Sequence, residues 1–279
     1  MLESCQLCPR RCKVNRLKDE KGFCGIGRFA KVSSAFAHFG EEPELVGVSG
    51  SGTIFFSGCN LKCVYCQNFE ISCLEEGKTL YPEELAEVMI RLQEFGCHNI
   101  NFVTPTHVAP QILEALEIAI QKGLKIPLVY NCGGYENVEV IKILRGVIDI
   151  YMPDAKYSKK ESAEKYSLAP DYWQILKEVL KEMHSQVGDL VCEDGIAKKG
   201  LIIRHLVLPN NLAGSFEILD FIAKELSLNT YVNIMAQYRP CYKAYEFKEL
   251  SRRITLSEYK EVIDYAKLIG LKRGFDLNV

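Results

Sequence analysis

Short apolar runs alternate with longer amphipathic segments along the chain, a pattern that predicts β-strands each followed by an α-helix. Proline in the first turn and glycine just past the last turn mark helix ends, as at Pro82 and Gly96. Six strands are expected, over residues 53–56, 100–103, 128–130, 147–151, 201–208 and 231–235. Six helices are expected, over residues 82–95, 110–121, 138–144, 172–183, 215–226 and 257–268.

Strands that are each followed by a helix imply an α/β fold with a parallel sheet and right-handed crossovers. A partial (β/α)6 barrel of TIM-like type and an open doubly wound sheet both satisfy this pattern. Polar residues follow the predicted strands, and in a barrel these carboxyl ends converge on one rim, where sites occur. The partial barrel is therefore the expected fold. The polar residues concerned are Thr104, Thr106, His107, Asn131, Asp154, Lys156, Asn233 and Gln237.

Composition describes an ordinary globular protein. The chain has 279 residues, of which 48% are hydrophobic and 25% charged, with a formal net charge of -2. Nucleic acid is not an expected partner of such a chain. No apolar run approaches the ~20 residues that cross a bilayer, and the first residues lack a basic and apolar leader. We therefore expect no membrane association and a cytoplasmic location.

Twelve cysteines point to metal binding, because a reducing cytosol disfavours disulfides. They form two groups near the start of the chain, while the others are scattered. Residues 1–48 are expected to be a small cysteine-rich segment that binds metal, and residues 49–279 the core barrel. The first group is Cys5, Cys8, Cys12 and Cys24, and the second is Cys59, Cys63 and Cys66.

The second group lies in a single loop directly after the first predicted strand. Three thiolates are one short of the usual four for a cubane cluster, so one iron of a [4Fe-4S] cluster is left open to a ligand that is not protein. The alternative is a zinc site that recruits Cys73 or His98 as its fourth ligand.

This loop resembles the hallmark of the radical S-adenosylmethionine (SAM) superfamily, Cys-x3-Cys-x2-Cys with an aromatic residue, here Tyr65, before the third cysteine. From residue 51 to 271 the chain is similar to the pyruvate formate-lyase activating enzyme-like branch, including the run NFVTPTH at 101–107. The resemblance implies a partial (β/α)6 barrel, a [4Fe-4S] cluster, and SAM bound to the open iron. It implies reductive cleavage of SAM to a 5'-deoxyadenosyl radical that abstracts hydrogen.

In the activating branch the hydrogen donor is a glycine of a glycyl-radical protein. The resemblance therefore implies such a protein as a partner, with reduced flavodoxin or ferredoxin as the electron donor. It also implies catalytic roles near SAM for Asp154 and Lys156, and a cofactor-binding role for Asn131 at the end of the third strand.

Arg204 and His205 interrupt an otherwise apolar strand, and adjacent strand residues point to opposite faces, so one of them must enter the barrel. A guanidinium there requires an anion, which is either the SAM carboxylate or a protein carboxylate. The family's Gly-Gly-Glu stretch for the SAM amino group is missing after the second strand. Thr104, backbone carbonyls and His107 are the candidates to replace it.

The N-terminal thiols lie in a segment too short to form its own hydrophobic core, so we expect a bound metal to stabilise its fold. Zinc and a second [4Fe-4S] cluster both suit four thiolates, and the spacing does not choose between them.

Two other functions compete with an activase. One is a radical SAM enzyme that modifies a small molecule or peptide, and the other is a zinc or iron-sulfur protein without turnover. For the first alternative, a closed pocket is expected to be shaped by Tyr135, Tyr157, His184 and Gln237.

Overall fold

Six parallel strands form the centre of a mixed sheet in the computed structural model, which describes residues 1–275. They lie side by side in chain order, with each strand paired in parallel to the next. The chain therefore has an α/β fold, as predicted. The six strands are β2 (Ser51–Phe56), β4 (Ile100–Val103), β5 (Leu128–Cys132), β6 (Ile150–Pro153), β8 (Ile196–Leu206) and β9 (Tyr231–Met235).

Three antiparallel strands that the sequence pattern did not predict extend this sheet. β1 (Ala30–His38) pairs with β2, β3 (Lys78–Leu80) pairs with β1, and β7 (Val191–Glu193) pairs with β8. β1 contains small and polar residues and shows no clear alternation of buried and exposed positions, which is why it was missed. Residues 1–48 therefore contribute to the sheet a strand that lies between β3 and β2. Within this segment, residues 1–29 contain no strand.

All six predicted helices are present, and residues 1–275 contain three further short α-helices that were not predicted. The short ones are α1 (Pro43–Val46), α2 (Phe69–Ser72) and α6 (Lys160–Ser167). α6 is only eight residues long and mostly polar, and Ala163 and Tyr166 are its buried apolar residues, so its sequence lacks a strong helical pattern. The predicted helices are α3 (Pro82–Glu94), α4 (Ala109–Gln121), α5 (Val138–Ile143), α7 (Tyr172–Val187), α8 (Ser215–Phe221), which continues as a π-helical turn (Ile222–Leu226), and α9 (Leu256–Leu268).

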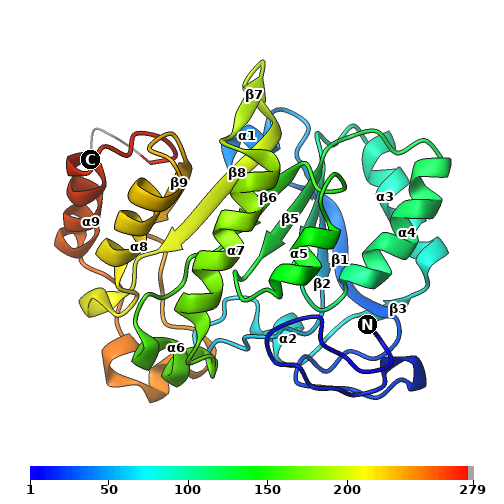
Figure 1. Cartoon of the computed structure of the whole chain (residues 1–279), viewed down its shortest axis with the longest axis horizontal. Helices are drawn as coiled ribbons and strands as arrows, with labels where there is room; N and C mark the ends of the chain where they lie inside the picture. The colour runs from blue at the N-terminus through cyan, green and yellow to red at the C-terminus, as the bar shows by residue number, and fades with distance from the viewer. Residues whose placement is uncertain (276–279) are drawn as a thin grey trace.

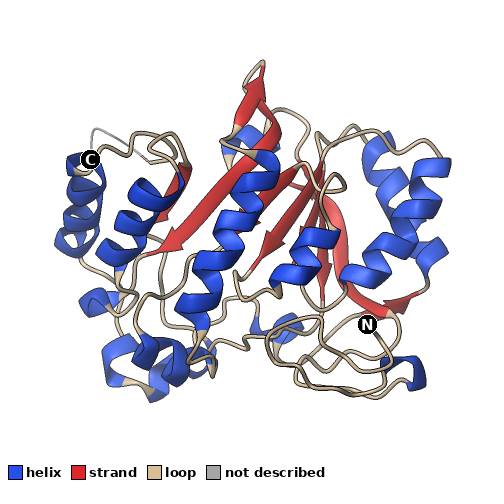
Figure 2. Cartoon of the chain, in the orientation of Figure 1, coloured by secondary structure: helices blue, strands red, loops and turns tan. Residues whose placement is uncertain are grey.

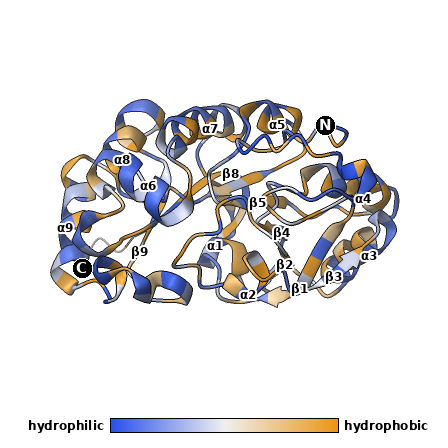
Figure 3. Cartoon of the chain, turned by 90° about the horizontal axis from the view of Figure 1, so that it is seen from below, coloured by the Kyte–Doolittle hydropathy of each residue, from blue (hydrophilic) through white to orange (hydrophobic). Residues whose placement is uncertain are grey.

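Helices α4, α5, α7 and α8 cover one face of the sheet (Figures 1 and 2). Figure 3, which views the molecule from below, shows these helices along one side of the strands. Alternate strand residues face them, so Tyr130 and Ile203 belong to the main core while their neighbours Val129 and Ile202 belong to a smaller cluster on the other face. Within the described residues, none of the helices is long and apolar enough to cross a membrane.

The carboxyl ends of the parallel strands all point the same way, towards the lower edge in Figure 1. The N-terminal loops, α2 and α6 lie at this edge (Figure 1). The two cysteine groups therefore lie at the same edge of the sheet, where ligands of parallel sheets are bound.

Candidate active site

A cavity of about 230 Å³ lies at the carboxyl ends of the parallel strands. The loop after β2 lines it with three thiols, those of Cys59, Cys63 and Cys66. The other parallel strands each direct at least one polar side chain to the same cavity. These side chains are Thr104 after β4, Asn131 on β5, Asp154 and Lys156 after β6, Arg204 on β8 and Gln237 after β9.

Each of the three thiols has a hydrogen-bonding partner. Burial raises the pKa of Cys59 to about 11 and that of Cys66 to about 12, so these groups stay protonated until a metal binds. The Leu61 N–H donates to Cys59 Sγ (3.3 Å), the Ser167 hydroxyl donates to Cys63 Sγ (3.0 Å), and the Ser72 hydroxyl lies 3.1 Å from Cys66 Sγ.

The N-terminal segment holds this cysteine loop in place. Gly58 has φ +79°, and a Cβ there would lie 2.4 Å from the carbonyl oxygen of Cys24. Glycine is therefore required where the two cysteine segments meet. Arg10 Nε donates to the carbonyl of Asn60 (2.8 Å), and the Asn60 amide donates to the carbonyl of Tyr135 (2.6 Å). The two groups of cysteines are thus parts of one packed region.

Four charged groups form a network, and three of them lie on the cavity wall. Asp154 accepts from Lys156 Nζ at 2.7 Å and from Arg204 Nε at 2.9 Å. Arg204 also donates to Asn131 Oδ1 (2.6 Å) and pairs with Glu41 (3.3 Å). Burial alone would raise the pKa of Asp154, but its attraction to Arg204 and Lys156 outweighs that effect and holds the pKa below its ordinary value. Asp154 is therefore ionised at neutral pH.

The structure supplies the anion that Arg204 requires, and it is a protein carboxylate. Glu41 precedes α1 and carried no signal in the sequence, because nothing in its neighbourhood indicates that it meets β8. His205 faces the other way, between the Ala155 carbonyl (2.7 Å) and the Ser215 hydroxyl (2.8 Å). Of the two basic residues, Arg204 is the one that lines the cavity, whereas His205 is buried on the opposite face of the sheet.

Tyr65 and Thr104 both line the cavity. Tyr65 is buried, with its ring 6.3 Å from that of Tyr157 and 5.9 Å from that of Tyr238. Thr104 has φ +59°, and its N–H donates to the Asn131 carbonyl (2.8 Å). A β-branched residue in the left-handed region is strained, and such strain is concentrated at functional sites.

His107 does not reach this cavity. Its Nε2 lies 2.8 Å from the Ser57 carbonyl, and its side chain lines a smaller cavity with the four N-terminal thiols. The hydrogen bond to the backbone holds the ring beneath the cysteine loop instead of at the rim. Burial lowers the pKa of His107 to about 4, so the ring is neutral at pH 7.

The residues expected to shape a closed pocket are not assembled. Gln237 lines the cavity, but Tyr135, Tyr157 and His184 are not among its lining residues. His184 instead lies 3.1 Å from Asp189, away from the cysteine loop.

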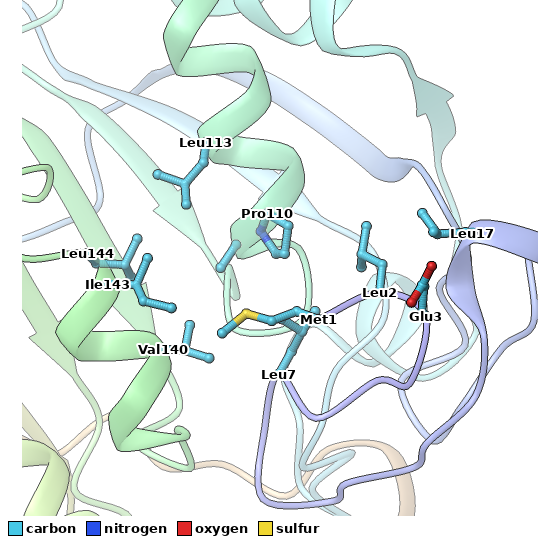
Figure 4. Close-up of a pocket in the computed structure, with 11 residues that line it drawn as sticks. Met1, Leu2, Glu3, Leu7, Leu17, Pro110, Leu113, Val140, Ile143 and Leu144 are labelled. Carbon is cyan, nitrogen blue, oxygen red and sulfur yellow. The ribbon is translucent and has the colours of Figure 1, made fainter.

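A second hollow, of about 370 Å³, lies between the N-terminal segment and helices α4 and α5 (Figure 4). Its lining is apolar, with side chains such as Met1, Leu113 and Ile143, and Glu3 is the one charged residue among them. Glu3 is its one side chain able to bind a metal or transfer a proton, and a single carboxylate does not make a metal site. The cavity at the strand ends is therefore the candidate active site.

Residues 53–192 match the family model of the radical SAM superfamily. This match covers half of the chain, including the three-cysteine loop, Asn131, Asp154 and Lys156. The chain belongs to the radical SAM superfamily. Its relatives include "Uncharacterized protein MJ0674" of Methanocaldococcus jannaschii, which is 37% identical over 286 residues, covering 99% of this chain and 78% of that protein. "Uncharacterized protein MJ0808" of the same organism is 25% identical over 292 residues, covering 91% of this chain and 78% of that protein.

Solved structures share the radical SAM fold at low identity. The FeFe-hydrogenase maturase HydG from Carboxydothermus hydrogenoformans has a TM-score of 0.52 at 15% identity, over 76% of this chain and 49% of that one. The structure titled "Native anSMEcpe with bound AdoMet" has a TM-score of 0.51 at 14% identity, over 76% of this chain and 57% of that one. This chain thus spans about half the length of these two proteins, and the likeness shows the fold alone.

The cavity suits the cofactors of the radical SAM superfamily, a [4Fe-4S] cluster and SAM. Three thiols with hydrogen-bonding partners line it beside a charged and polar wall. In residues 1–275, no three cysteine, histidine or carboxylate side chains converge as ligands of a single metal ion. A cubane binds each thiolate through a different iron, so its ligands surround a volume rather than a point. The residues present therefore fit the cluster.

Proposed function

We propose that this chain is an activase-like radical SAM enzyme that abstracts hydrogen from a glycine of a partner protein. The observation that carries the proposal is the meeting of the three-cysteine loop with Asp154, Lys156 and Arg204 in one cavity. The order of the six parallel strands supports a partial (β/α)6 barrel as its frame. The Asp-x-Lys pair is the element of the site that resembles the activating branch.

Each side chain has a task that follows from its position. Cys59, Cys63 and Cys66 hold the cluster, which when bound supplies the electron that cleaves SAM to methionine and a 5'-deoxyadenosyl radical. Lys156 places a positive charge in the cavity that the three thiols also line, and Asp154 holds its ammonium group in place through a hydrogen bond. Burial would lower the pKa of Lys156, but Asp154 outweighs that effect and raises it. Lys156 therefore remains charged.

Asn131 and Thr104 are the polar groups left to bind SAM. Asn131 Oδ1 is held by Arg204, which leaves its amide N–H groups free to donate to a ligand such as the SAM carboxylate. Thr104 contributes its hydroxyl from a strained backbone on the rim. In this arrangement Arg204 positions Asn131 and Asp154.

A macromolecular substrate fits the cavity better than an enclosed small molecule. Three of the four residues expected to close the pocket lie outside its lining, so the cavity is not closed by them. The partners that follow are a glycyl-radical protein and reduced flavodoxin or ferredoxin as electron donor. All twelve cysteines are free thiols, which supports a reducing, cytoplasmic location.

Anaerobic reconstitution followed by a SAM cleavage assay tests the chemistry. Wild-type protein with dithionite should release 5'-deoxyadenosine, whereas Cys63→Ala should reduce the release to background because one iron loses its thiolate. Cys192→Ala is the matched control, a part-buried cysteine outside both groups, and should keep full cleavage. Cleavage by Cys63→Ala at the wild-type rate would refute the assignment of the cluster.

A deuterated peptide tests the substrate separately. A short peptide with one glycine carrying deuterium at Cα should transfer deuterium to 5'-deoxyadenosine, and the same peptide with deuterated alanine in its place should not. Cleavage of SAM without deuterium transfer from the glycine peptide would contradict glycine as the hydrogen donor and leave the radical SAM assignment intact.

A further inference from the structure

The four N-terminal thiols line a second, smaller cavity that is separate from the active site. Residues 1–29 form loops apart from one short 3-10 helix, Arg16–Lys18. Backbone hydrogen bonds fold these loops around the cavity, from Cys5 N to the Val14 carbonyl (2.9 Å) and from Lys13 N to the Cys5 carbonyl (2.9 Å). Arg16 and His107 are among the other residues that line this cavity, together with Leu7, Arg10, Arg11, Val14, Gly22 and Phe23.

His107 lines this cavity and has an unused ring nitrogen. The residue is 1% exposed, and its Nε2 lies 2.8 Å from the Ser57 carbonyl. A carbonyl only accepts hydrogen bonds, so Nε2 carries the ring hydrogen and Nδ1 carries a lone pair. Nδ1 is buried and has no hydrogen-bond partner. Histidine that binds a metal commonly donates its other ring N–H to a backbone carbonyl, which is the arrangement found here.

Arg16 brings a positive charge that lacks a counter-ion. The side chain is buried, Nε donates to the Gly27 carbonyl (2.8 Å), and Nη1 donates to the His107 carbonyl (2.5 Å). Nη2 is buried without a partner, and no ion pair joins Arg16 to a carboxylate among residues 1–275. The nearby carboxyl of Glu136 instead accepts hydrogen bonds from two neutral hydroxyl groups. A buried guanidinium requires an anion, and thiolates around a metal supply one.

We propose that the N-terminal cavity holds a second metal centre in which His107 Nδ1 joins the cysteine thiolates as a ligand and Arg16 balances the negative charge. Among residues 1–275 no three such ligands converge on a single metal ion, so an iron-sulfur cluster, which binds each ligand through a different iron, fits this cavity better than zinc. With three thiolates and one imidazole the cluster is anionic. The second ring nitrogen of His107 ties this centre to Ser57, two residues before Cys59 of the active-site loop. The centre thereby braces the loop that binds the catalytic cluster.

The test uses the full chain with Cys59, Cys63 and Cys66 replaced by alanine, so that the active-site cluster is absent. Anaerobic samples receive either ferrous iron with sulfide or zinc alone, and bound metal is measured after desalting. We expect one iron-sulfur centre per chain from the treatment with iron and sulfide, whether the proposed activity exists or not. Retention of neither metal, or of zinc alone, by folded protein, as judged by circular dichroism, would overturn the proposal.

His107→Gln tests the ligand itself. Its amide nitrogen replaces Nε2 as the donor to Ser57, whereas its carbonyl oxygen is a much weaker ligand than Nδ1 for a thiolate-bound metal. His205→Gln is the matched control, a buried neutral histidine on another face of the sheet whose two ring nitrogens both have protein partners. We expect His107→Gln to weaken metal binding at least about tenfold, and His205→Gln to leave it unchanged.

Spectroscopy on otherwise wild-type protein gives an independent readout. Nitrogen hyperfine coupling in the reduced iron-loaded protein should be present with His107 and absent in His107→Gln. Equal metal affinity and equal spectra in the His107 and His205 variants would overturn the role of His107 as a ligand.

Discussion

Replacing Arg204 by leucine tests whether the guanidinium serves the protein's own carboxylates or the SAM carboxylate. The change removes a partner of Asp154 at 2.9 Å and of Glu41 at 3.3 Å, whose side chains are 18% and 9% exposed. Removing one partner of a buried ion pair costs about 3 to 5 kcal/mol. Lys156 still neutralises Asp154, so we expect a loss near the lower end, about 3 kcal/mol at pH 7.

The defect should depend on pH in a defined direction. In the wild-type chain the lowered pKa of Asp154 means that its stabilising effect is present above the unfolded pKa, about 4, and is lost as the pH falls through the folded value. Without Arg204 the pKa values of Asp154 and Glu41 rise, and both carboxyls take up protons as the pH falls. The destabilisation of Arg204→Leu should therefore be larger at about pH 8 than at about pH 5.5.

Thermal unfolding and SAM affinity are measured on the same anaerobic samples. A loss of about 3 kcal/mol corresponds to a fall in Tm of about 6 to 12 °C for a chain of this size. Adding Glu41→Gln to Arg204→Leu should restore part of the loss, because one stranded carboxylate is then neutral. An unchanged Tm with a tenfold or greater loss of SAM affinity would refute this reasoning and assign Arg204 to the SAM carboxylate.

Three further predictions concern single residues. Gly58→Ala should lower the free energy of unfolding by about 2 kcal/mol and reduce iron content, because the new Cβ would lie 2.4 Å from the Cys24 carbonyl oxygen. Gly146→Ala is the control, because Gly146 has φ +76° and open space around it, so this variant should show the backbone strain alone. Glu136→Gln should remove a pH dependence of the free energy of unfolding. Burial raises the pKa of Glu136 to about 7, so its ionisation destabilises the wild-type fold on the order of 3 kcal/mol as the pH rises from about 4 to 7. Unfolding curves at both pH values measure the difference. Lys156→Met should reduce SAM cleavage at least about tenfold while iron content stays near the wild-type value, and full cleavage would remove Lys156 from the catalytic site.

The sequence alone determined the elements that depend on local pattern. Apolar runs and amphipathic periods predicted the six parallel strands and their helices, because burial of alternate or every third to fourth side chain leaves a direct signal. The spacing of Cys59, Cys63 and Cys66 predicted one shared site, since a single loop carries all three thiols. Polar residues after the strands predicted the wall of the cavity, because the carboxyl ends of parallel strands meet at one edge.

Only the tertiary structure decided the partners that lie far apart in the chain. Glu41 forms an ion pair with Arg204, and β1 pairs with β2 beside the parallel strands, although neither Glu41 nor β1 has a distinctive local pattern. His107 follows a strand as the other site residues do, yet its ring turns to the Ser57 carbonyl and to the N-terminal thiols. Long-range packing sets these contacts, and the residues that make them carry no signal until the strands are placed side by side.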